Sequence, residues 1–292
     1  MVCGNKKCAV LVPFYKESLT LSETFSLTTT RRILSTWDKY LIGPNKLRSV
    51  LTGSGGEDFS VKCFMDQYFN SIKGYNRLLL SPLLYDKFQE YEYVLIVQLD
   101  ALVISDSLME WCDKGLSYVG APWFDGFTKA TEKSSFLGVG NGGFSLRNVE
   151  HAQKVLKDTK LSSLNSNTIG KLPGNVRSLF SSGIFALNKW HTLPRWNEDM
   201  VWGLIVPHKV NFFVVPSIQE AARFSFEVNP RRLFELNGST LPFGCHAWQR
   251  YDSSFWFDVL GESFFGDYYD VLKMQTKPHN FSIILRHLLR DD

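Results

Sequence analysis

The sequence predicts an α/β fold in which a mixed, mostly parallel β-sheet is flanked by helices. Apolar runs of strand length alternate with segments of helical spacing, a pattern typical of parallel sheets covered on both faces. With 292 residues, 44% of them hydrophobic, the chain is long enough to bury a sizeable core. We therefore expect a single domain over residues 1–292.

The first part of the chain predicts repeated strand and helix steps, because strand-like apolar runs are followed by apolar residues at helical spacing. The expected elements are a strand over Lys7–Val12, a helix over Ser22–Trp37 capped by Ser22, a strand over Leu47–Leu51, a loop over Gly53–Gly56, and helical segments over Phe64–Phe88 that break near Gly74 and restart at Ser81-Pro82.

The next expected element is a buried strand over Tyr93–Ile104, and the order of elements is less regular beyond Asn141. The remaining expected elements are a helix over Ser107–Lys114, a strand over Tyr118–Gly120, a loop through Pro122 and Trp123, a helix over Val149–Lys157, a polar stretch over Asp158–Ser182, a helix over Met200–Val206, a strand over Phe212–Pro216, and an aromatic-rich tail over Phe243–Tyr269. A polar stretch of this length inside a compact domain is functional or disordered.

Composition narrows the class of protein. The net charge is +3, from 32 basic and 29 acidic residues that are interspersed, so nothing requires a nucleic-acid partner or a membrane surface. The apolar stretch near the N-terminus is too short for a signal peptide, and no segment reaches the roughly 18 to 20 apolar residues of a membrane helix. Five scattered cysteines in apolar contexts indicate reduced thiols and a cytoplasmic location.

Asp100 is the most informative single residue. It interrupts, together with Gln98, the apolar run YVLIVQLDALVI, where an unpaired carboxylate would be costly. Asp100 is therefore expected at the carboxyl end of the strand, holding a cation, and a hard divalent metal ion fits a carboxylate at that edge of an open sheet. The alternative is a strand-end cap or a salt-bridge partner.

Three further segments suggest that Asp100 belongs to a site. In the segment GNGGFSLR over Gly140–Arg147, two consecutive glycines after an asparagine allow unusual backbone angles and close approach to a ligand, although a structural turn explains them equally well. Asn197-Glu198-Asp199 precedes a helical run, so its acids are either helix caps or a general base. His246, in PFGCHAW, is either a hydrogen-bonded core residue or a further ligand of a Mn²⁺-like ion.

In this order the segments resemble an uncharacterised domain family regarded as glycosyltransferase-like, with a GT-A (Rossmann-like) nucleotide-sugar fold. The resemblance spans about residues 8–257. The segments that carry it are Gln98-Leu99-Asp100-Ala101, Gly120-Ala121-Pro122-Trp123, Gly140–Arg147, Asn197-Glu198-Asp199 and Pro242–Trp248. The same order is similar to a compressed version of the inverting β-1,4-galactosyltransferase scheme.

This resemblance implies a set of site residues. Asp100 and His246 match metal ligands for Mn²⁺ or Mg²⁺, and Gln98 stands where the family has the first acid of Asp-x-Asp. Asp199, or Glu198 beside it, matches the catalytic base. Implied contacts to the donor or its sugar pocket are Pro13, Tyr15, Tyr75, Asn76, Arg77, Gln98, Leu99, Trp123, Asn141, Gly142, Gly143, Arg147 and Trp248.

The expected function is metal-dependent, inverting transfer of a sugar from a nucleotide sugar, with UDP favoured, to a hydroxyl of a glycan or glycoconjugate. Residues 1–125 would form the donor half and residues 126–292 the acceptor and catalytic half, with Asp158–Ser182 closing as a lid. Two alternatives are a sugar-binding or nucleotide-sugar-binding protein without activity, and a transferase acting on modified nucleic-acid bases. The weak net charge argues against the last.

Overall fold

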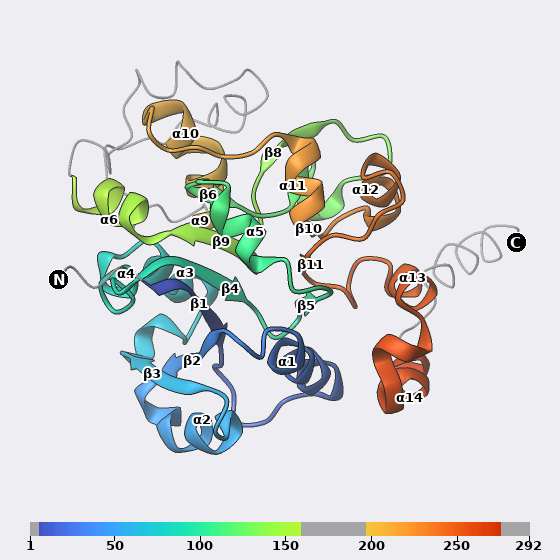
Figure 1. Ribbon diagram of the computed structural model, residues 1–292, viewed down its shortest axis with the longest axis horizontal. Coiled ribbons are helices and arrows are strands. Elements are labelled where there is room, and N and C mark those ends of the chain that lie inside the picture. Colours follow the sequence, from blue (N-terminus) through green and yellow to red (C-terminus); the bar gives the residue numbers. More distant parts are fainter. Residues whose placement is uncertain (1–5, 159–196, 276–292) are drawn as a thin grey trace, which may run out of the picture.

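The computed structural model describes residues 6–158 and 197–275, and its centre is a six-stranded sheet with the strand order β3-β2-β1-β4-β9-β6 (Figure 1). Strands β1 to β4 run parallel, and β9 runs antiparallel to both of its neighbours. The expected α/β class with a mixed, mostly parallel sheet is confirmed. The strands are β1 (Lys6–Pro13), β2 (Asp38–Pro44), β3 (Ser60–Phe64), β4 (Tyr91–Val97), β6 (Tyr118–Val119) and β9 (Phe144–Asn148).

Helices cover both faces of this sheet, because alternate side chains of its strands are apolar on both sides. In β1, Leu11 faces one layer and Val10 faces the other. The layer on the Leu11 side contains α3 (Ile72–Leu79), α4 (Pro82–Asp86), α6 (Val149–Lys157) and a continuous helical segment made of α9 (Glu198–Met200), a π-helical turn (Val201–Ile205) and α10 (Val206–Lys209). The opposite layer contains α1 (Leu21–Ile33), α2 (Arg48–Gly55) and α5 (Leu108–Asp113).

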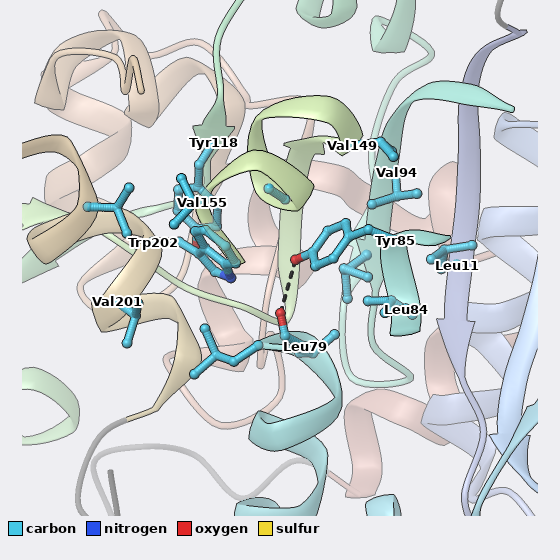
Figure 2. Packing of buried hydrophobic residues seen from close by; sticks show 14 of the residues in the cluster. Leu11, Leu79, Leu84, Tyr85, Val94, Tyr118, Val149, Val155, Val201 and Trp202 are labelled. Carbon is cyan, nitrogen blue, oxygen red and sulfur yellow. Dashed lines mark hydrogen bonds between the residues drawn. The ribbon is translucent and has the colours of Figure 1, made fainter. Parts of the chain in front are cut away.

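The layer on the Leu11 side is built from large side chains. Figure 2 shows Tyr85 of α4 and Trp202 of the π-helical turn packed near Val149 and Val155 of α6. The hydroxyl of Tyr85 donates a hydrogen bond to the carbonyl of Leu79 over 3.0 Å, so its polar atom is satisfied inside the core. This packing holds the helical segment that begins at Glu198 against the sheet.

A smaller region lies beside the main sheet (Figure 1). It has a three-stranded sheet in the order β10-β11-β5 and a two-stranded sheet of β7 and β8. A third apolar cluster, with Trp248 and Trp256 fully buried, packs it against α1. Its elements are β5 (Leu102–Val103), β7 (Pro122–Phe124), β8 (Phe136–Val139), α11 (Ile218–Phe224), β10 (Ser225–Phe226), α12 (Pro230–Leu236), β11 (Gly244–Cys245), α13 (Ser253–Phe265) and α14 (Tyr269–Gln275). Short 3₁₀ turns complete the fold at Asn45–Leu47, Asp66–Tyr68, Phe127–Lys129 and Gly266–Tyr268.

The predicted cap of α1 at Ser22 is wrong by two residues. Thr20 caps the helix, and Thr20 and Glu23 form a capping box in which each side chain bonds the backbone N–H of the other. The helix ends at Ile33 rather than at Trp37. The spacing T-x-x-E was the decisive local signal.

Two predicted strands are wrong. Leu47–Leu51 starts helix α2, and the strand lies earlier, at Asp38–Pro44. Leu47 and Leu51 are both buried and four residues apart, which is the spacing of one helix face. Phe212–Pro216 has no strand ladder, although the carbonyl of Val214 accepts a hydrogen bond from the Ser117 N–H over 2.8 Å.

Two other segments differ from expectation. The segment Phe64–Phe88 begins with the last residue of β3, and Gly74 lies inside α3 rather than at a break. Glycine is required at this position because a Cβ would collide with the carbonyl of Gln67. Pro122 and Trp123 belong to β7 rather than to a loop. Helices expected over Ser107–Lys114, Val149–Lys157 and from Ser81-Pro82 are confirmed, as are the strands around Lys7–Val12 and Tyr118–Gly120.

The four cysteines in the described residues, Cys8, Cys63, Cys112 and Cys245, are free and buried, consistent with their expected packing as small hydrophobes. In the same part of the chain, no helix is long and apolar enough to cross a membrane. The predicted lid over Asp158–Ser182 lies, apart from Asp158 itself, outside the described residues.

Candidate active site

A cavity of about 1260 Å³ opens at the carboxyl ends of β1 and β4. This is where open α/β sheets bind ligands, because loops from several strands meet there. Most of the residues expected from the sequence line it: Pro13, Tyr15, Tyr75, Asn76, Gln98, Asp100, Trp123, Asn141, Gly142, Gly143, Glu198, Asp199 and His246.

The pairing of β4 with β9 explains why sequence-distant segments meet there. Val97, the last residue of β4, pairs with Phe144, the first residue of the antiparallel β9. Beyond this pair, the Gln98 N–H donates a hydrogen bond to the carbonyl of Gly143 over 2.8 Å. The end of one strand and the start of the other therefore bring their loops to the same edge of the sheet.

Asp100 lies after β4 in a tight turn closed by a hydrogen bond from the Ala101 N–H to the Gln98 carbonyl over 2.9 Å. Its carboxylate Oδ1 is 3.2 Å from Nε2 of His246. The same Nε2 is 3.2 Å from Oε1 of Gln98, and Nδ1 on the other side of the ring is 2.9 Å from Oε1 of Glu227. Each nitrogen of His246 thus faces at least one acceptor oxygen.

These contacts shift both partners of the His246–Asp100 pair. Burial of the ring opposes protonation, but the charge of Asp100 and hydrogen bonds to Asp100 and Glu227 raise the pKa of His246 to about 10. Burial acts against ionisation of Asp100, but the His246 charge and hydrogen bond lower the pKa of that carboxyl below its usual value. The cluster therefore holds a positive charge between its acceptor oxygens.

A divalent cation fits this cluster by donor chemistry. A carboxylate oxygen of Asp100 and the amide oxygen of Gln98 both lie 3.2 Å from the same imidazole nitrogen, and Glu227 bonds the far nitrogen of the ring as a carboxylate does in metal sites with histidine ligands. Among the described residues, however, no group of three His, Cys, Asp or Glu side chains is placed to hold a metal ion. The third protein donor would be the amide of Gln98.

The glycine pair serves close packing of side chains rather than unusual backbone angles. A Cβ at Gly142 would collide with the Glu198 carboxylate, and a Cβ at Gly143 would collide with the His246 ring. The left-handed residue in this segment is Asn141, with φ of 67°. The expectation of special backbone angles at the glycines is therefore wrong, and the close neighbours are charged side chains of the protein.

Asn141 is 2% exposed and is held in its strained conformation by its neighbours. Its Oδ1 accepts a hydrogen bond from the Gly143 N–H over 3.0 Å, and its carbonyl accepts one from the Tyr118 hydroxyl over 3.0 Å. Its side-chain nitrogen has no hydrogen-bond partner within the described residues. This donor is available to an acceptor oxygen in the cavity.

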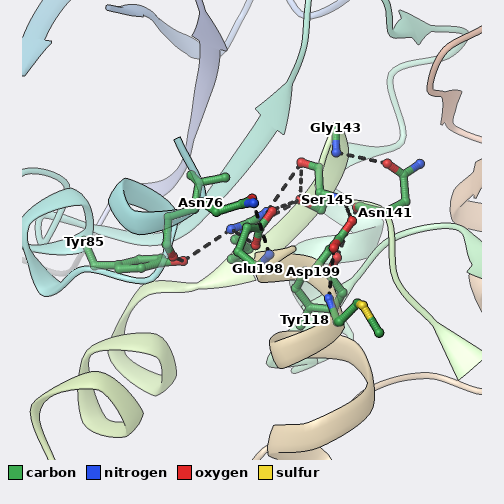
Figure 3. Close-up of polar contacts among 12 residues, drawn as sticks. Asn76, Tyr85, Tyr118, Asn141, Gly143, Ser145, Glu198 and Asp199 are labelled. Atoms are coloured by element: carbon green, nitrogen blue, oxygen red, sulfur yellow. Dashed lines mark hydrogen bonds and ion pairs between the residues drawn. The ribbon is translucent and has the colours of Figure 1, made fainter. Parts of the chain in front are cut away.

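Glu198 and Asp199 begin the helical segment but have different surroundings (Figure 3). Glu198 is 3% exposed, and its two carboxylate oxygens each lie 2.9 Å from a different terminal nitrogen of Arg147, which is 1% exposed. Arg147 also donates to Ser145 Oγ over 3.0 and 3.1 Å. This buried ion pair leaves Asp199 as the carboxylate of the two that is available for proton transfer.

Asp199 accepts two backbone hydrogen bonds, from Gly142 N–H over 3.0 Å and from Met200 N–H over 2.9 Å. Burial, followed by the charge of Glu198, outweighs these bonds and raises the pKa of Asp199 to about 7. A carboxyl group with this pKa is suited to accept a proton near neutral pH.

Three further expected contacts, Tyr15, Trp123 and Asn76, lie in the wall of the cavity. Tyr15 is 50% exposed at the cavity, and Trp123 packs edge-on against Phe127 in its wall. Asn76 lines the cavity, but its amide also bonds the side chain of Asn197 and the N–H of Glu198, which fixes α3 to the start of α9.

Four expected contacts do not line the cavity. Arg77 is exposed on α3, next to the buried Leu78. Leu99 is 3% exposed within the core, and Trp248 is fully buried with its indole N–H bonded to Ser26. Arg147 is occupied by Glu198. Their expected roles as donor contacts are therefore corrected to roles in packing and positioning.

Glu227, Arg250 and Tyr251 are among the cavity-lining residues that the sequence did not predict. Arg250 is exposed, and its guanidinium lies 5.2 Å from the ring of Tyr251. Glu227 follows the two-residue strand β10 and has no motif around it. Its only signal was a lone acid after Phe226, which is too common a pattern to be specific.

Comparison with known proteins adds the following. No curated protein matches the sequence. Structural similarity is found to the galactosyltransferase LgtC in complex with donor and acceptor sugar analogs, at 11% identity and a TM-score of 0.47, covering 86% of this chain and 95% of that one. It is also found to mouse xyloside xylosyltransferase 1, at 11% identity and a TM-score of 0.49, covering 82% and 97%.

The bifunctional glycosyltransferase WbbM is similar at 10% identity and a TM-score of 0.42, covering 94% of this chain and 52% of that one. In sequence, residues 58–246 match one family model, and this stretch carries Gln98, Asp100, the glycine pair, Asp199 and His246. The match covers more than half of the chain, so the chain belongs to DUF5672, a family described as proteins of unknown function.

Proposed function

We propose that this protein is a glycosyltransferase that moves a sugar from a nucleotide sugar to a hydroxyl group of a glycan or glycoconjugate. One observation carries the proposal: a carboxylate with a pKa of about 7, Asp199, lines the same large cavity as the His246–Asp100 cluster at the carboxyl ends of the strands. A base and a cation site within one cavity are what transfer from a diphosphate leaving group requires.

The cavity has separate features for the two substrates. At about 1260 Å³ it exceeds the usual volume of a small-ligand pocket, so donor and acceptor fit together. We assign the donor nucleotide to the side of Pro13 and Tyr15, where the half-exposed ring of Tyr15 is available for stacking on a base. The exposed Arg250 supplies a cation for the donor phosphates.

Asp199 is the proposed catalytic base, and the acceptor would lie against it. Its carboxylate removes the proton of the acceptor hydroxyl as that oxygen attacks the anomeric carbon on the face opposite the leaving nucleotide. This geometry gives inversion of configuration. The buried Arg147–Glu198 pair and the Gly142 N–H hold Asp199 in place, and the free amide nitrogen of Asn141 is available to a sugar oxygen.

A Mn²⁺ or Mg²⁺ ion would be held by Asp100, His246 and the amide oxygen of Gln98. When bound, such an ion supplies positive charge to the diphosphate of the donor. UDP remains the favoured nucleotide, on the family resemblance described above. We place the donor half in residues 1–125, the acceptor half in residues 126–292, and the reaction in the cytoplasm.

The test is a screen of the purified full-length chain against UDP-, GDP- and dTDP-sugars, with Mn²⁺ and with a chelator. Nucleotide release with a panel of glycan acceptors is followed for the wild type and for Asp199→Asn. The control is Asp258→Asn, which removes a carboxylate on α13 whose side chain is 64% exposed. We expect release of one nucleotide by the wild type and the control, and a loss of about 10²-fold to 10⁴-fold in Asp199→Asn with donor binding kept.

The pH dependence gives a second readout. Because the base acts when it is ionised and burial raises its pKa to about 7, turnover should rise as the pH increases through about 7. If no nucleotide sugar binds under any condition, the proposed function is wrong. Binding without release across all acceptors, equally in wild type and Asp199→Asn, would instead favour the non-catalytic alternative.

A further inference from the structure

We propose that Glu227 is a positioning residue that fixes the ring of His246 and so sets the affinity of the site for a divalent cation. The inference rests on the proposed function only in assuming that His246 and Asp100 take a metal ion. Glu227 has a side chain 13% exposed, and its Oε1 is 2.9 Å from Nδ1 of His246.

The backbone builds this contact. Strands β10 and β11 pair in parallel, with Phe226 opposite Cys245, and Glu227 and His246 are the residues that follow each member of this pair. The His246 N–H donates to the carbonyl of Phe226 over 3.0 Å, so the two residues leave the ladder together. Their contact therefore comes from strand register and not from chance encounter of long side chains.

The third strand of the same sheet brings Asp100 to the other side of the ring. Strand β5 is antiparallel to β11, with Leu102 opposite Cys245, and Asp100 precedes Leu102 by two residues. Glu227, His246 and Asp100 therefore come from three adjacent strands, with the imidazole in the middle. This order places the ring between two carboxylates of the cavity wall, one at each of its nitrogens.

Hydrogen-bond chemistry then determines which nitrogen faces the cavity. An ionised carboxylate only accepts hydrogen bonds, so the contact with Glu227 places a hydrogen on Nδ1. This leaves Nε2 directed at Asp100 Oδ1 and Gln98 Oε1, each 3.2 Å away. Without Glu227, the ring is free to exchange the roles of its two nitrogens, and the metal-binding nitrogen is no longer fixed.

The packing of the ring supports the same assignment. The backbone of Gly143 lies so close to the imidazole that a Cβ there would collide with it. One face of the ring is therefore held by backbone, whereas the orientation within the ring plane is held by Glu227 through a hydrogen bond. The amide of Gln98 also contacts Nε2, but it contributes to the cation side of the ring and not to the tautomer.

The experiment measures binding of Mn²⁺ alone to the full-length chain at fixed pH, with free Mn²⁺ followed by electron paramagnetic resonance. The variants are Glu227→Leu, Glu227→Gln and Asp100→Ala, with Glu235→Gln on α12 as a control because that acid is exposed. We expect Glu227→Leu to weaken Mn²⁺ binding about 10-fold to 100-fold, which is the usual effect of losing such a partner. Glu227→Gln, which keeps an acceptor oxygen, should recover part of the loss.

A second readout separates positioning from folding and from ligation. When Mn²⁺ is removed and the pH is above about 10, the ring has released one of its two hydrogens. The ¹⁵N shifts of the His246 ring should then show the remaining hydrogen on Nδ1 in the wild type, and a mixture of tautomers in a folded Glu227→Leu variant. Unchanged Mn²⁺ affinity in Glu227→Leu would overturn the proposal. So would complete loss of binding, as in Asp100→Ala, with an unchanged tautomer, since Glu227 would then be a ligand.

Failure of this inference is distinguishable from failure of the proposed function. If the wild type binds Mn²⁺ and Glu227→Leu weakens that binding, the positioning role stands even when no sugar is transferred. Absence of Mn²⁺ binding by the wild type overturns the inference. Sugar transfer measured with a chelator present would then still support the transferase.

Discussion

The two charged clusters at the cavity differ in their access to solvent. The side chains of Arg147 and Glu198 are 2% and 3% exposed and bond each other through two contacts of 2.9 Å. In the second cluster, the side chains of His246 and Asp100 are 16% and 53% exposed and meet over 3.2 Å. A closed pair fixes the backbone around it, whereas a pair with one exposed partner remains available to a ligand.

The largest effect on stability is expected from removing one member of the closed pair, Arg147 and Glu198. Arg147→Met leaves the Glu198 carboxylate buried without its partner and should lower the free energy of unfolding by about 3 to 5 kcal/mol. Chemical denaturation measures this. The double variant Arg147→Met/Glu198→Gln should lose less than the single one, because no charge is left unpaired. A single variant that loses under about 1 kcal/mol would show that the pair is not structural.

The glycine pair allows a matched comparison of the two clusters. A methyl group at Gly142 collides with Glu198, so Gly142→Ala should destabilise the fold by about 1 to 3 kcal/mol. A methyl group at Gly143 collides with the His246 ring, so Gly143→Ala should weaken Mn²⁺ binding about tenfold or more. Melting curves and Mn²⁺ titrations of both variants check this. Equal effects of the two substitutions on both measurements would contradict the separation.

Asp199 lies next to the Arg147–Glu198 pair, and its ionised carboxylate should lower the free energy of unfolding at high pH. Its pKa is raised to about 7 in the folded state from 3.8, so the folded protein holds the proton more tightly than the unfolded chain. The free energy of unfolding of the wild type should therefore fall relative to Asp199→Asn as the pH rises from about 4 to 7, and stay lower above 7. We expect a gain of about 2 kcal/mol for Asp199→Asn at pH 8 and a smaller gain at pH 5.

A pH-independent difference between Asp199→Asn and the wild type would show that its carboxyl titrates normally. Urea denaturation of both proteins at the two pH values makes the measurement. Replacing a functional carboxylate often raises the stability of the fold while lowering activity, because active-site groups are not optimised for stability.

The smallest expected effect is at the open cluster. Asp100 is 53% exposed, so its pairing with His246 is screened, and Asp100→Asn should change the free energy of unfolding by less than about 1 kcal/mol. The same variant should nevertheless reduce Mn²⁺ binding, because an amide oxygen is a weaker ligand than a carboxylate. A large loss of stability in Asp100→Asn would place this pair with the structural one.

The sequence predicted the central strands of the sheet better than the strands and helices beside them. The apolar run at Lys7–Val12 and the first part of the run at Tyr93–Ile104 form central strands, because burial on two faces demands such runs. The single strand predicted over Tyr93–Ile104 is wrong beyond Val97, because a turn at Gln98–Ala101 follows and Leu102–Val103 pair in the three-stranded sheet. The strand at Asp38–Pro44 was missed, since its polar start, Asp38 and Lys39, conceals the buried remainder. The apolar residues Leu47 and Leu51 fit a strand or a helix by pattern, and only the structure shows that Leu47 ends a 3₁₀ turn and Leu51 lies in α2.

The site was predictable where residue type alone restricts chemistry. Asp100 and His246 are polar groups within apolar segments, Asp199 belongs to an acidic pair before a helical run, and all three line the cavity. Arg147 and Glu198 look equally functional in sequence, and only the structure shows that they form an ion pair with each other. Glu227 was not predictable, because its partner is fixed by the register of two-residue strands that leave almost no pattern in the sequence.

Because β9 runs antiparallel to β4, the two ends of the central strands have different surroundings, and the end away from the cavity is suitable for attaching a label. The start of β9 pairs with the end of β4 at the cavity. The turn before β4, in which Gln89 and Glu90 are exposed, therefore lies at the opposite end of the strand, away from the cavity. Extra residues are tolerated best at such exposed turns. A fluorophore or short peptide tag inserted there would report on the protein during binding and turnover while leaving the cavity open.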